Sequence, residues 1–548
     1  MADDAQRKHD AKVAAKLSGD DAQDILALGK QQVFVRKYGF WTVFGIAVCT
    51  SGTWEGITAA VAQALNSGGP GALLYGYIAA AAFSLVNVAS LAELASAWPT
   101  SGALYHWNMT LAPPKYRPFM GFITGYLIVG TGWLGITSAM SGVAIQLQSY
   151  LILSRPEYVA ERWHMALIFW GFMLVGSGLH LCSAKAIEFL NISAMVIHVF
   201  GYVAVIIVLL VCTKEKHTAE WVFTGFQNYS GWSSGMAWCI GLLSSVYGFG
   251  GLETAAYYSE ETQHASRTIP RAMFYNVLAN GLLTFPFIIV FLFCVGDLES
   301  VLSSPIGTMS PTTQIYVNAT GSITGGILMN CMATMIAFVS AVDAIGSGSR
   351  ALFAMARDGM FPKWLAHVDP RFDVPVRAMA VIVFPPMLII LIYIGNTTAF
   401  YGFMSGILVS IMGLYAIPIG ILLSNRLRNK IEMGPWNLGK LGPFVNIMAL
   451  MWCSFLMIVL SFPTTNPVTY QNMNYASLLV GGIVIFSIVF WFTYGKRSGY
   501  KGGIVEIQAE AICGNEIEGS STNDDDTKAA IEAATAKTHT RDVSGSEA

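Results

Sequence analysis

The feature that most constrains this chain is a series of twelve apolar runs, each long enough to cross a bilayer as a helix. A helical span needs about 20 mainly apolar residues to cross the hydrocarbon core. The first, third and eighth runs are longer than that, so tilts or breaks are expected in them. The runs therefore predict an all-α membrane protein of about twelve spans, over residues 39–65, 71–97, 119–153, 164–183, 187–212, 234–258, 273–296, 322–348, 378–395, 399–424, 443–463 and 475–494.

The sparse and uneven charge favours the same class. Only 12% of the residues are charged and 54% are hydrophobic, whereas soluble domains carry roughly 25% charge. With both termini placed in the cytosol, the loops outside the membrane contain few of the 31 Lys and Arg residues, namely Arg155, Arg162, Lys214 and Lys216. This asymmetry follows the positive-inside rule, and it supports an even number of spans.

The composition also predicts three segments. Residues 39–494 are expected to form the transmembrane domain, between cytosolic tails at 1–38 and 495–548 that have few aromatic residues and are expected to be disordered. Three glycosylation triplets fall in loops placed outside, at Asn228, Asn318 and Asn396. We expect an integral multi-pass protein of the plasma membrane, with a vacuolar or other internal membrane as the alternative.

Two glycine-rich segments occupy matching places in spans one and six, five spans apart as a five-plus-five inverted repeat requires. They read CTSGTWEG at 49–56 and SSVYGFGGLE at 244–253. Glycine lowers the cost of unwinding a helix, and unwound segments expose amides, carbonyls and helix ends that bind ligands. Close helix packing is the alternative reason for such glycines. The substrate-binding candidates here are Ser51, Gly52, Trp54, Glu55, Gly56, Tyr247, Gly248, Phe249, Gly250, Gly251 and Glu253.

Ionisable residues inside spans are the second signal. A charged Asp or Glu at the centre of a span costs at least ~2.5–3.5 kcal/mol on insertion scales, yet Glu55, Glu253 and Asp343 lie in spans, with His198 near the middle of span five. Such a carboxyl group can bind a proton on one side of a membrane and release it on the other, and histidine does so near neutral pH. A protonated acid that is hydrogen-bonded within the bundle is the structural alternative.

Aromatic residues near the breaks are candidates for binding a cation. A ring face attracts an ammonium group, more strongly when the group is desolvated. Trp54, Tyr247 and Phe249 lie in the two glycine-rich segments, and Tyr126 and Trp133 lie on span three. Aromatic residues are also common throughout membrane proteins and favour their interfaces.

The chain resembles the amino acid–polyamine–organocation superfamily, and within it the fungal amino acid/choline/GABA permeases, over roughly residues 38–494. The order and spacing of the motifs carry the resemblance: SGTWE at 51–55, NSGGP at 66–70, SLAELAS at 90–96, PTSGALYHW at 99–107, SEET at 259–262, IPRA at 269–272, SR at 349–350 and ARDGMFP at 356–362. Two departures concern substrate choice, because Glu253 stands where Asp is common and Tyr257-Tyr258 stands where histidine is common.

The resemblance implies the leucine-transporter-like fold, with two inverted five-helix repeats followed by two more helices. It also implies a substrate site between the broken spans one and six, closed by spans three, eight and ten. The function expected is proton-coupled uptake of a small amine-bearing solute, such as an amino acid, GABA or choline. A non-transporting nutrient sensor with the same fold is the alternative. We expect no enzyme activity, no cofactor, no metal and no nucleic-acid partner.

The sequence offers alternatives both for the class of substrate and for the residues that carry the coupled proton. A substrate carboxylate would lie against amides of residues 51–56, where an ionised Glu55 would repel it, and an ammonium would instead gain from Glu55, Glu253 and the aromatic rings. This argument favours cationic amines unless Glu55 is protonated. For coupling, members of the superfamily place a cationic side chain of span five near spans one and eight. We therefore expect a protonated His198 to meet Asp343, with Glu55 or Glu253 as alternative proton carriers and a bond from neutral His198 to a carbonyl as the structural alternative.

Overall fold

The computed structural model describes residues 36 to 500, except residues 37, 183, 308, 370, 373, 429, 430, 432 and 499. All of the described residues belong to one unit, Met1–Gly503. The disordered tails predicted at 1–38 and 495–548 lie almost entirely outside the described residues, so the predicted domain boundaries stay predictions.

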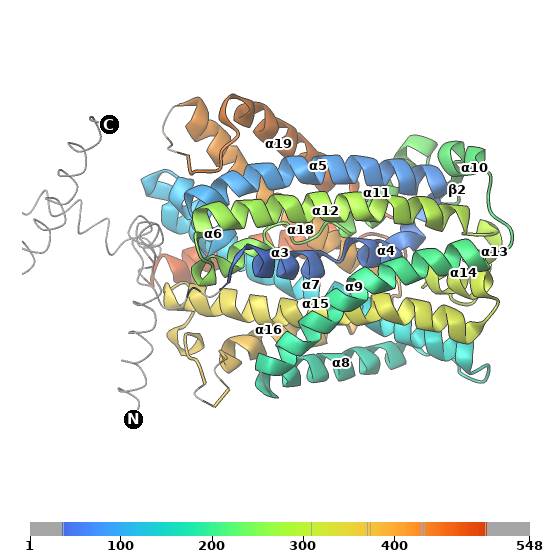
Figure 1. Ribbon diagram of the computed structural model, residues 1–548. Helices are drawn as coiled ribbons and strands as arrows, with labels where there is room; N and C mark the ends of the chain where they lie inside the picture. Colours follow the sequence, from blue (N-terminus) through green and yellow to red (C-terminus); the bar gives the residue numbers. More distant parts are fainter. Residues whose placement is uncertain are drawn as a thin grey trace, which may run out of the picture. The chain divides into compact units, whose positions relative to one another are not determined.

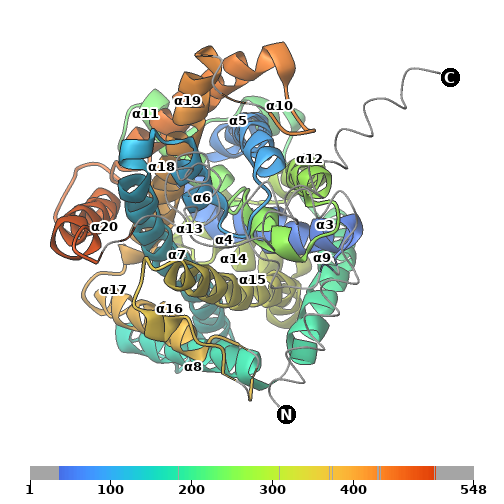
Figure 2. The same ribbon diagram turned by 90° about the vertical axis from the view of Figure 1, so that its left-hand side faces the viewer.

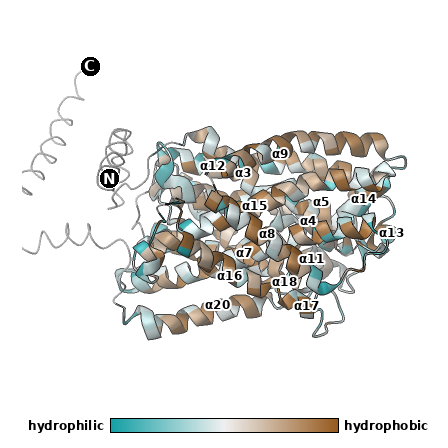
Figure 3. Ribbon diagram, turned by 90° about the horizontal axis from the view of Figure 1, so that it is seen from below, coloured by the Kyte–Doolittle hydropathy of each residue, from teal (hydrophilic) through white to brown (hydrophobic). Residues whose placement is uncertain are grey.

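Ten helices in the described part of the chain are long and apolar enough to cross a membrane. They run side by side in Figure 1, and Figure 3 shows apolar residues along their lengths and hydrophilic residues at the two ends of the bundle. The predicted all-α membrane fold is confirmed. The helices are α5 (Gly69–Ala97), α7 (Arg117–Ser154), α8 (Arg162–Cys182), α9 (Ala184–Cys212), α12 (Ala265–Phe293), α15 (Ile323–Arg357), α16 (Val376–Ile389) with α17 (Ile392–Gly395), α18 (Ala399–Leu427), α19 (Gly442–Val459) and α20 (Ala476–Phe490) with the π-helical turn η5 (Trp491–Gly495).

The two predicted spans that are missing from this set are spans one and six, because each is interrupted. Span one consists of α3 (Phe40–Ser51) and α4 (Thr53–Asn66), separated at Gly52, whose φ of 44° lies in the left-handed region. Span six consists of α11 (Ser234–Tyr247) and the 3₁₀ segment η2 (Thr254–Glu261). Both breaks fall inside the glycine-rich segments, as predicted.

The two broken spans lie side by side and run in opposite directions. A Cβ on Gly56 of α4 would lie 3.3 Å from the Cα of Gly248, at the end of α11. The far end of α4 continues into β1 (Ser67–Gly68), which pairs antiparallel with β2 (Gln227–Asn228), just before α11. At the other end of the pair, Tyr38 before α3 forms a bridge with Thr262 after η2. This antiparallel arrangement is the one that an inverted repeat produces.

The breaks of the two spans lie inside the bundle. Figure 2 shows α4 among α5, α7, α15 and α18, and α3 between α12 and α9 at the edge, with α8, α16, α19 and α20 also on the outside. Short helices connect the spans: α6 (Ala103–Leu111), α10 (Ala219–Thr224), α13 (Leu298–Ser303), α14 (Pro311–Thr320), and the 3₁₀ turns η1 (Pro114–Tyr116), η3 (Lys363–Leu365) and η4 (Gly439–Leu441). This arrangement places both breaks where spans three (α7), eight (α15) and ten (α18) surround them.

Candidate functional site

The break in span one is held in place by its neighbours. The hydroxyl of Ser340 on α15 donates a hydrogen bond of 3.1 Å to the carbonyl of Thr50, and Asn276 of α12 donates one of 2.9 Å to the Ser51 hydroxyl. After the break, Glu55 lies in the first turn of α4. A carboxylate is favourable there because the unpaired amides give a helix N-terminus a partial positive charge.

The break in span six is longer and has no regular helix between Tyr247 and Thr254. Gly251 adopts a φ of 76°, and a Cβ on Gly248 would lie 2.9 Å from the Thr53 carbonyl and 2.8 Å from Ile57. Glycine is therefore required at Gly251 by its backbone conformation. At Gly248 it is required by the close approach of α4.

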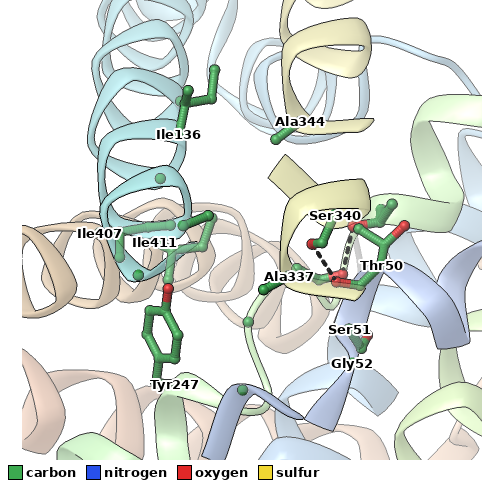
Figure 4. Close-up of a pocket in the computed structure, with 18 of the residues that line it drawn as sticks. Thr50, Ser51, Gly52, Ile136, Tyr247, Ala337, Ser340, Ala344, Ile407 and Ile411 are labelled. Carbon is green, nitrogen blue, oxygen red and sulfur yellow. Dashed lines mark hydrogen bonds between the residues drawn. The ribbon is translucent and has the colours of Figure 1, made fainter. Parts of the chain in front are cut away.

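A cavity of about 280 Å³ opens between the two breaks. Its walls come from the α3–α4 and α11–η2 segments and from α7, α15 and α18. Figure 4 shows Thr50, Ser51 and Gly52 beside Ala337 and Ser340, across the cavity from Ile136, Ile407 and Ile411. Eight of the predicted site residues line it: Ser51, Gly52, Glu55, Gly56, Tyr247, Gly250, Gly251 and Glu253.

Both glutamates of the two breaks contribute acidic side chains to the cavity. Glu55 and Glu253 line it, and its lining residues include no Lys, Arg or His. Three aromatic rings also line it, those of Tyr247, Tyr257 and Phe400. Oε2 of Glu55 is buried and has no hydrogen-bond partner among the described residues, and a Cβ on Gly52 would lie 3.6 Å from it. This combination of carboxylates and ring faces suits a cation.

One of the two carboxylates, Glu55, is paired with His198. Nδ1 of His198 on α9 lies 2.7 Å from Oε1 of Glu55, and both side chains are almost fully buried. The expected contact between His198 and Asp343 is therefore wrong. Asp343 on α15 is not part of the cavity lining and instead accepts a hydrogen bond of 3.1 Å from Asn191. His198 lies beside the break in span one. It is farther along α9 than Asn191, the residue that contacts Asp343.

The other carboxylate, Glu253, is bound by a residue that the sequence did not suggest. The hydroxyl of Tyr415 on α18 donates a hydrogen bond to Oε2 of Glu253. Tyr415 is buried, with 1% of its surface exposed. Nothing in the local sequence of α18 marks this tyrosine, because its role depends on which way α18 faces.

Five of the predicted substrate-binding residues lie outside the cavity lining, and four of these are aromatic. Trp54 packs against Phe287, with ring centroids 5.4 Å apart, and also contacts His198 and Tyr202. Phe249 stacks on Tyr77, Tyr126 stacks on Phe361, and the indole of Trp133 donates to the Val381 carbonyl. The fifth is Gly248, which packs against α4 as described above. These residues pack helices together.

Polar residues of α7, α14 and α15 form a hydrogen-bonded cluster beside the cavity, which we call the Gln146 cluster. Oε1 of Gln146 accepts hydrogen bonds from Ser310 at 2.5 Å and Asn330 at 2.6 Å, and Thr312 of α14 donates to the Thr58 carbonyl at 2.6 Å. Of these, Gln146 and Thr58 line the cavity, and sequence reasoning did not find them. Such side chains carry no sequence signal, because buried polar residues also occur wherever helices need hydrogen bonds.

A second cavity adjoins the first. This smaller cavity, of about 100 Å³, shares Tyr257, Ser347 and Ala351 with the first. Its lining also includes Arg350 and Arg357 of α15, together with Glu260 and Glu261 of η2. The cavity at the breaks therefore lies between the Gln146 cluster and this second cavity.

The three glycosylation triplets differ in the freedom of their asparagines. Nδ2 of Asn228 donates to the Trp232 carbonyl at 2.6 Å, and Nδ2 of Asn396 donates to the Gln471 carbonyl at 2.6 Å. Asn318, on α14, is exposed, and its Oδ1 accepts a hydrogen bond of 2.9 Å from Gln314. The first two amides are already engaged by backbone carbonyls, so Asn318 is the best acceptor of the three.

We expect glycan on Asn318 when the chain is made in a eukaryotic secretory pathway. Endoglycosidase treatment should increase the gel mobility of the wild type, Asn318→Gln should abolish the shift, and Asn396→Gln should retain it. A shift that disappears in Asn396→Gln, or no shift in any of the variants, would contradict the assignment. The same gel reports on which side of the membrane α14 lies, because glycans are added only on the luminal side.

Comparison with known proteins gives a consistent result. The family model described as "Amino acid permease" matches residues 38–486. The chain is 32% identical to the choline transporter of Saccharomyces cerevisiae over 85% of this chain and 83% of that protein. It is 30% identical to amino-acid permease 2 of Neurospora crassa over 88% of each chain, and 28% identical to amino-acid permease BAT1 of Arabidopsis thaliana over 88% of this chain and 95% of that one.

Proposed function

The chain belongs to the amino acid permease family and is an integral multi-pass membrane transporter, and from this premise we propose that it imports a small cationic amine together with protons. The observation that carries the choice of substrate is the charge of the cavity. Two carboxyl groups line it, and no Lys, Arg or His is among the described residues of its lining. A cation gains from such a site, because charges interact more strongly among packed helices than in bulk water.

A zwitterionic amino acid fits this cavity less well. Its carboxylate needs a positive partner, and the positive end of α4 already carries Glu55 in its first turn. Two carboxylates at one helix end repel each other. A quaternary or primary ammonium instead meets Glu253 and the rings of Tyr247, Tyr257 and Phe400. Among the relatives, the yeast choline transporter has a named substrate of this kind.

The pair of Glu55 and His198 supports proton coupling. The pair connects α4, which lines the cavity, with α9, which lies behind it. A proton on His198 makes the pair an ion pair, and loss of that proton weakens its attraction to Glu55. Proton binding therefore changes both the charge that a substrate meets at Glu55 and the strength of the contact between α9 and α4. A binding site at helix breaks that responds to helix movement is the arrangement that alternating access requires.

The direction of transport follows from the orientation that we propose. With both termini in the cytosol, the second cavity beside Arg350 lies on the cytosolic side, and the Gln146 cluster closes the extracellular side. This conformation then faces inward, ready to release substrate to the cytosol. The plasma membrane is the location that fits import of an external solute.

An uptake panel tests the substrate class. We expect proteoliposomes with the wild type to accumulate choline more readily than GABA, alanine or spermidine. Glu253→Gln should raise the KM for choline at least about tenfold, since about 1.4 kcal/mol of lost interaction corresponds to a factor of ten. The matched control is Glu157→Gln, which alters an exposed carboxylate in a loop and should leave the KM unchanged.

Two outcomes would contradict the proposal. Preferred uptake of alanine or GABA, with no competition from choline, would show that the charge of the cavity does not select the substrate. The absence of counterflow for every solute of the panel would favour the alternative, a sensor that keeps the permease fold without transport.

A further inference from the structure

The hydrogen bond between Tyr415 and Glu253 joins the break in span six to α18. Resting on the proposed function, we propose that Tyr415 is a positioning residue that holds the Glu253 carboxylate at the substrate cavity. Tyr415 itself is not among the residues that line the cavity, whereas Glu253 is. The tyrosine therefore acts on the substrate through the carboxylate.

The backbone that leads to Glu253 is irregular. Residues 248 to 253 form no regular helix, and glycines at 250 and 251 precede Glu253 with few constraints on the chain. A side chain on a regular helix takes its direction from the helix. On an irregular segment, contacts with neighbouring elements have to set that direction.

Tyr415 is suited to provide that contact. It lies within α18, a helix of 29 residues, so its ring has a defined origin. Its neighbours Leu414 and Ile411 line the cavity, whereas the Tyr415 ring is buried away from it. Tyr257 is a second hydroxyl close to the same carboxylate, but Tyr257 lines the cavity, where a substrate competes for the same space. Tyr415 can keep its bond to Glu253 while a substrate is bound.

The bond has two effects on a cationic substrate. It holds one carboxyl oxygen in a fixed place, and it places no positive charge beside the carboxyl group, since a tyrosine hydroxyl donates and stays uncharged. Hydrogen bonds to charged groups are the strong ones. The same bond also ties α18 to the broken span, so a shift of Glu253 on substrate binding is transmitted to α18.

The test is a double-mutant cycle on choline binding. The Kd is measured from the choline-dependent rise in unfolding temperature of the purified, detergent-solubilised full chain. We expect Tyr415→Phe, which keeps the buried ring, to raise the Kd about tenfold. In a Glu253→Gln background, the same substitution should change the Kd by less than about twofold, because the tyrosine acts through the carboxylate that is already lost.

The matched control is Tyr316→Phe. Tyr316 is a fully buried tyrosine of α14 whose hydroxyl has no hydrogen-bond partner among the described residues. Removing that hydroxyl should leave the Kd unchanged and should not lower the unfolding temperature without ligand, because an unpaired buried hydroxyl is itself destabilising.

The results of this cycle distinguish a positioning role of Tyr415 from a purely structural role and from a failure of the proposed function. An unchanged Kd in Tyr415→Phe overturns the inference alone, as does a rise of equal size in the Glu253→Gln background. A lower unfolding temperature with an unchanged Kd assigns Tyr415 a purely structural role and also overturns it. A wild type that binds no solute of the panel overturns the proposed function, and this inference with it.

Discussion

Gly250→Leu is expected to abolish substrate uptake while the protein still folds and reaches the membrane. Gly250 lines the cavity, and a Cβ there would meet only the Tyr247 carbonyl, at 3.4 Å. The backbone therefore accepts a side chain, whose remaining atoms extend into a cavity of about 280 Å³. The measurement is the initial uptake rate divided by the amount of protein in the membrane.

Gly52→Leu is expected to abolish uptake for a related reason. A Cβ at Gly52 would lie 3.6 Å from Glu55 Oε2 and from Ile336, so the leucine side chain would crowd the carboxylate. Its left-handed backbone also costs a non-glycine residue about 1–2 kcal/mol, and we expect a lower unfolding temperature in addition. Gly482→Leu is the control, because Gly482 on α20 is exposed and a Cβ there would have no described atom within 4 Å. Normal uptake by both cavity variants would rule out the site between the breaks.

The second large effect is expected for His198→Ala, which should still move substrate but no longer concentrate it. The substitution removes the partner of Glu55 at 2.7 Å and leaves a buried carboxylate without its cation. With the membrane potential clamped at zero in sodium-free buffer, an inward gradient of one pH unit supplies about 1.4 kcal/mol for each proton, enough for roughly tenfold accumulation. The wild type should reach this level, and His198→Ala should only equilibrate the substrate.

The clamp is essential because a cationic substrate would otherwise follow the membrane potential, which is worth about 2.3 kcal/mol per charge at 100 mV. The matched control is His180→Ala. His180 is another histidine of a span and is partly buried, but its Nε2 bonds the Val342 carbonyl at 2.8 Å, so its loss should leave accumulation intact. Concentrative uptake by His198→Ala would remove that residue from coupling, and a strict requirement for sodium would remove the proton.

Local patterns in the sequence determined the spans and the places where they break. Hydropathy over about 20 residues depends on composition alone, which explains why the interrupted and uninterrupted spans were both found. Left-handed backbone at Gly52 and Gly251 favours glycine whatever surrounds it, so each break is visible in the sequence as glycine at that position. The two glutamates stood out for a similar reason, because a carboxyl group inside an apolar run is costly wherever the helix packs.

Tertiary structure alone decided which side chains meet. Neighbouring residues of a helix point about 100° apart, so Glu55 lines the cavity while Trp54, next to it, packs on Phe287. The rotation of α9 and the height of His198 along the bundle likewise decide that His198 contacts Glu55 and that Asp343 contacts Asn191. The rotation of α18 also brings Tyr415 to Glu253 across 162 residues of chain. Helix rotation and height are set by the packing of all the spans together, and no local run of residues encodes them.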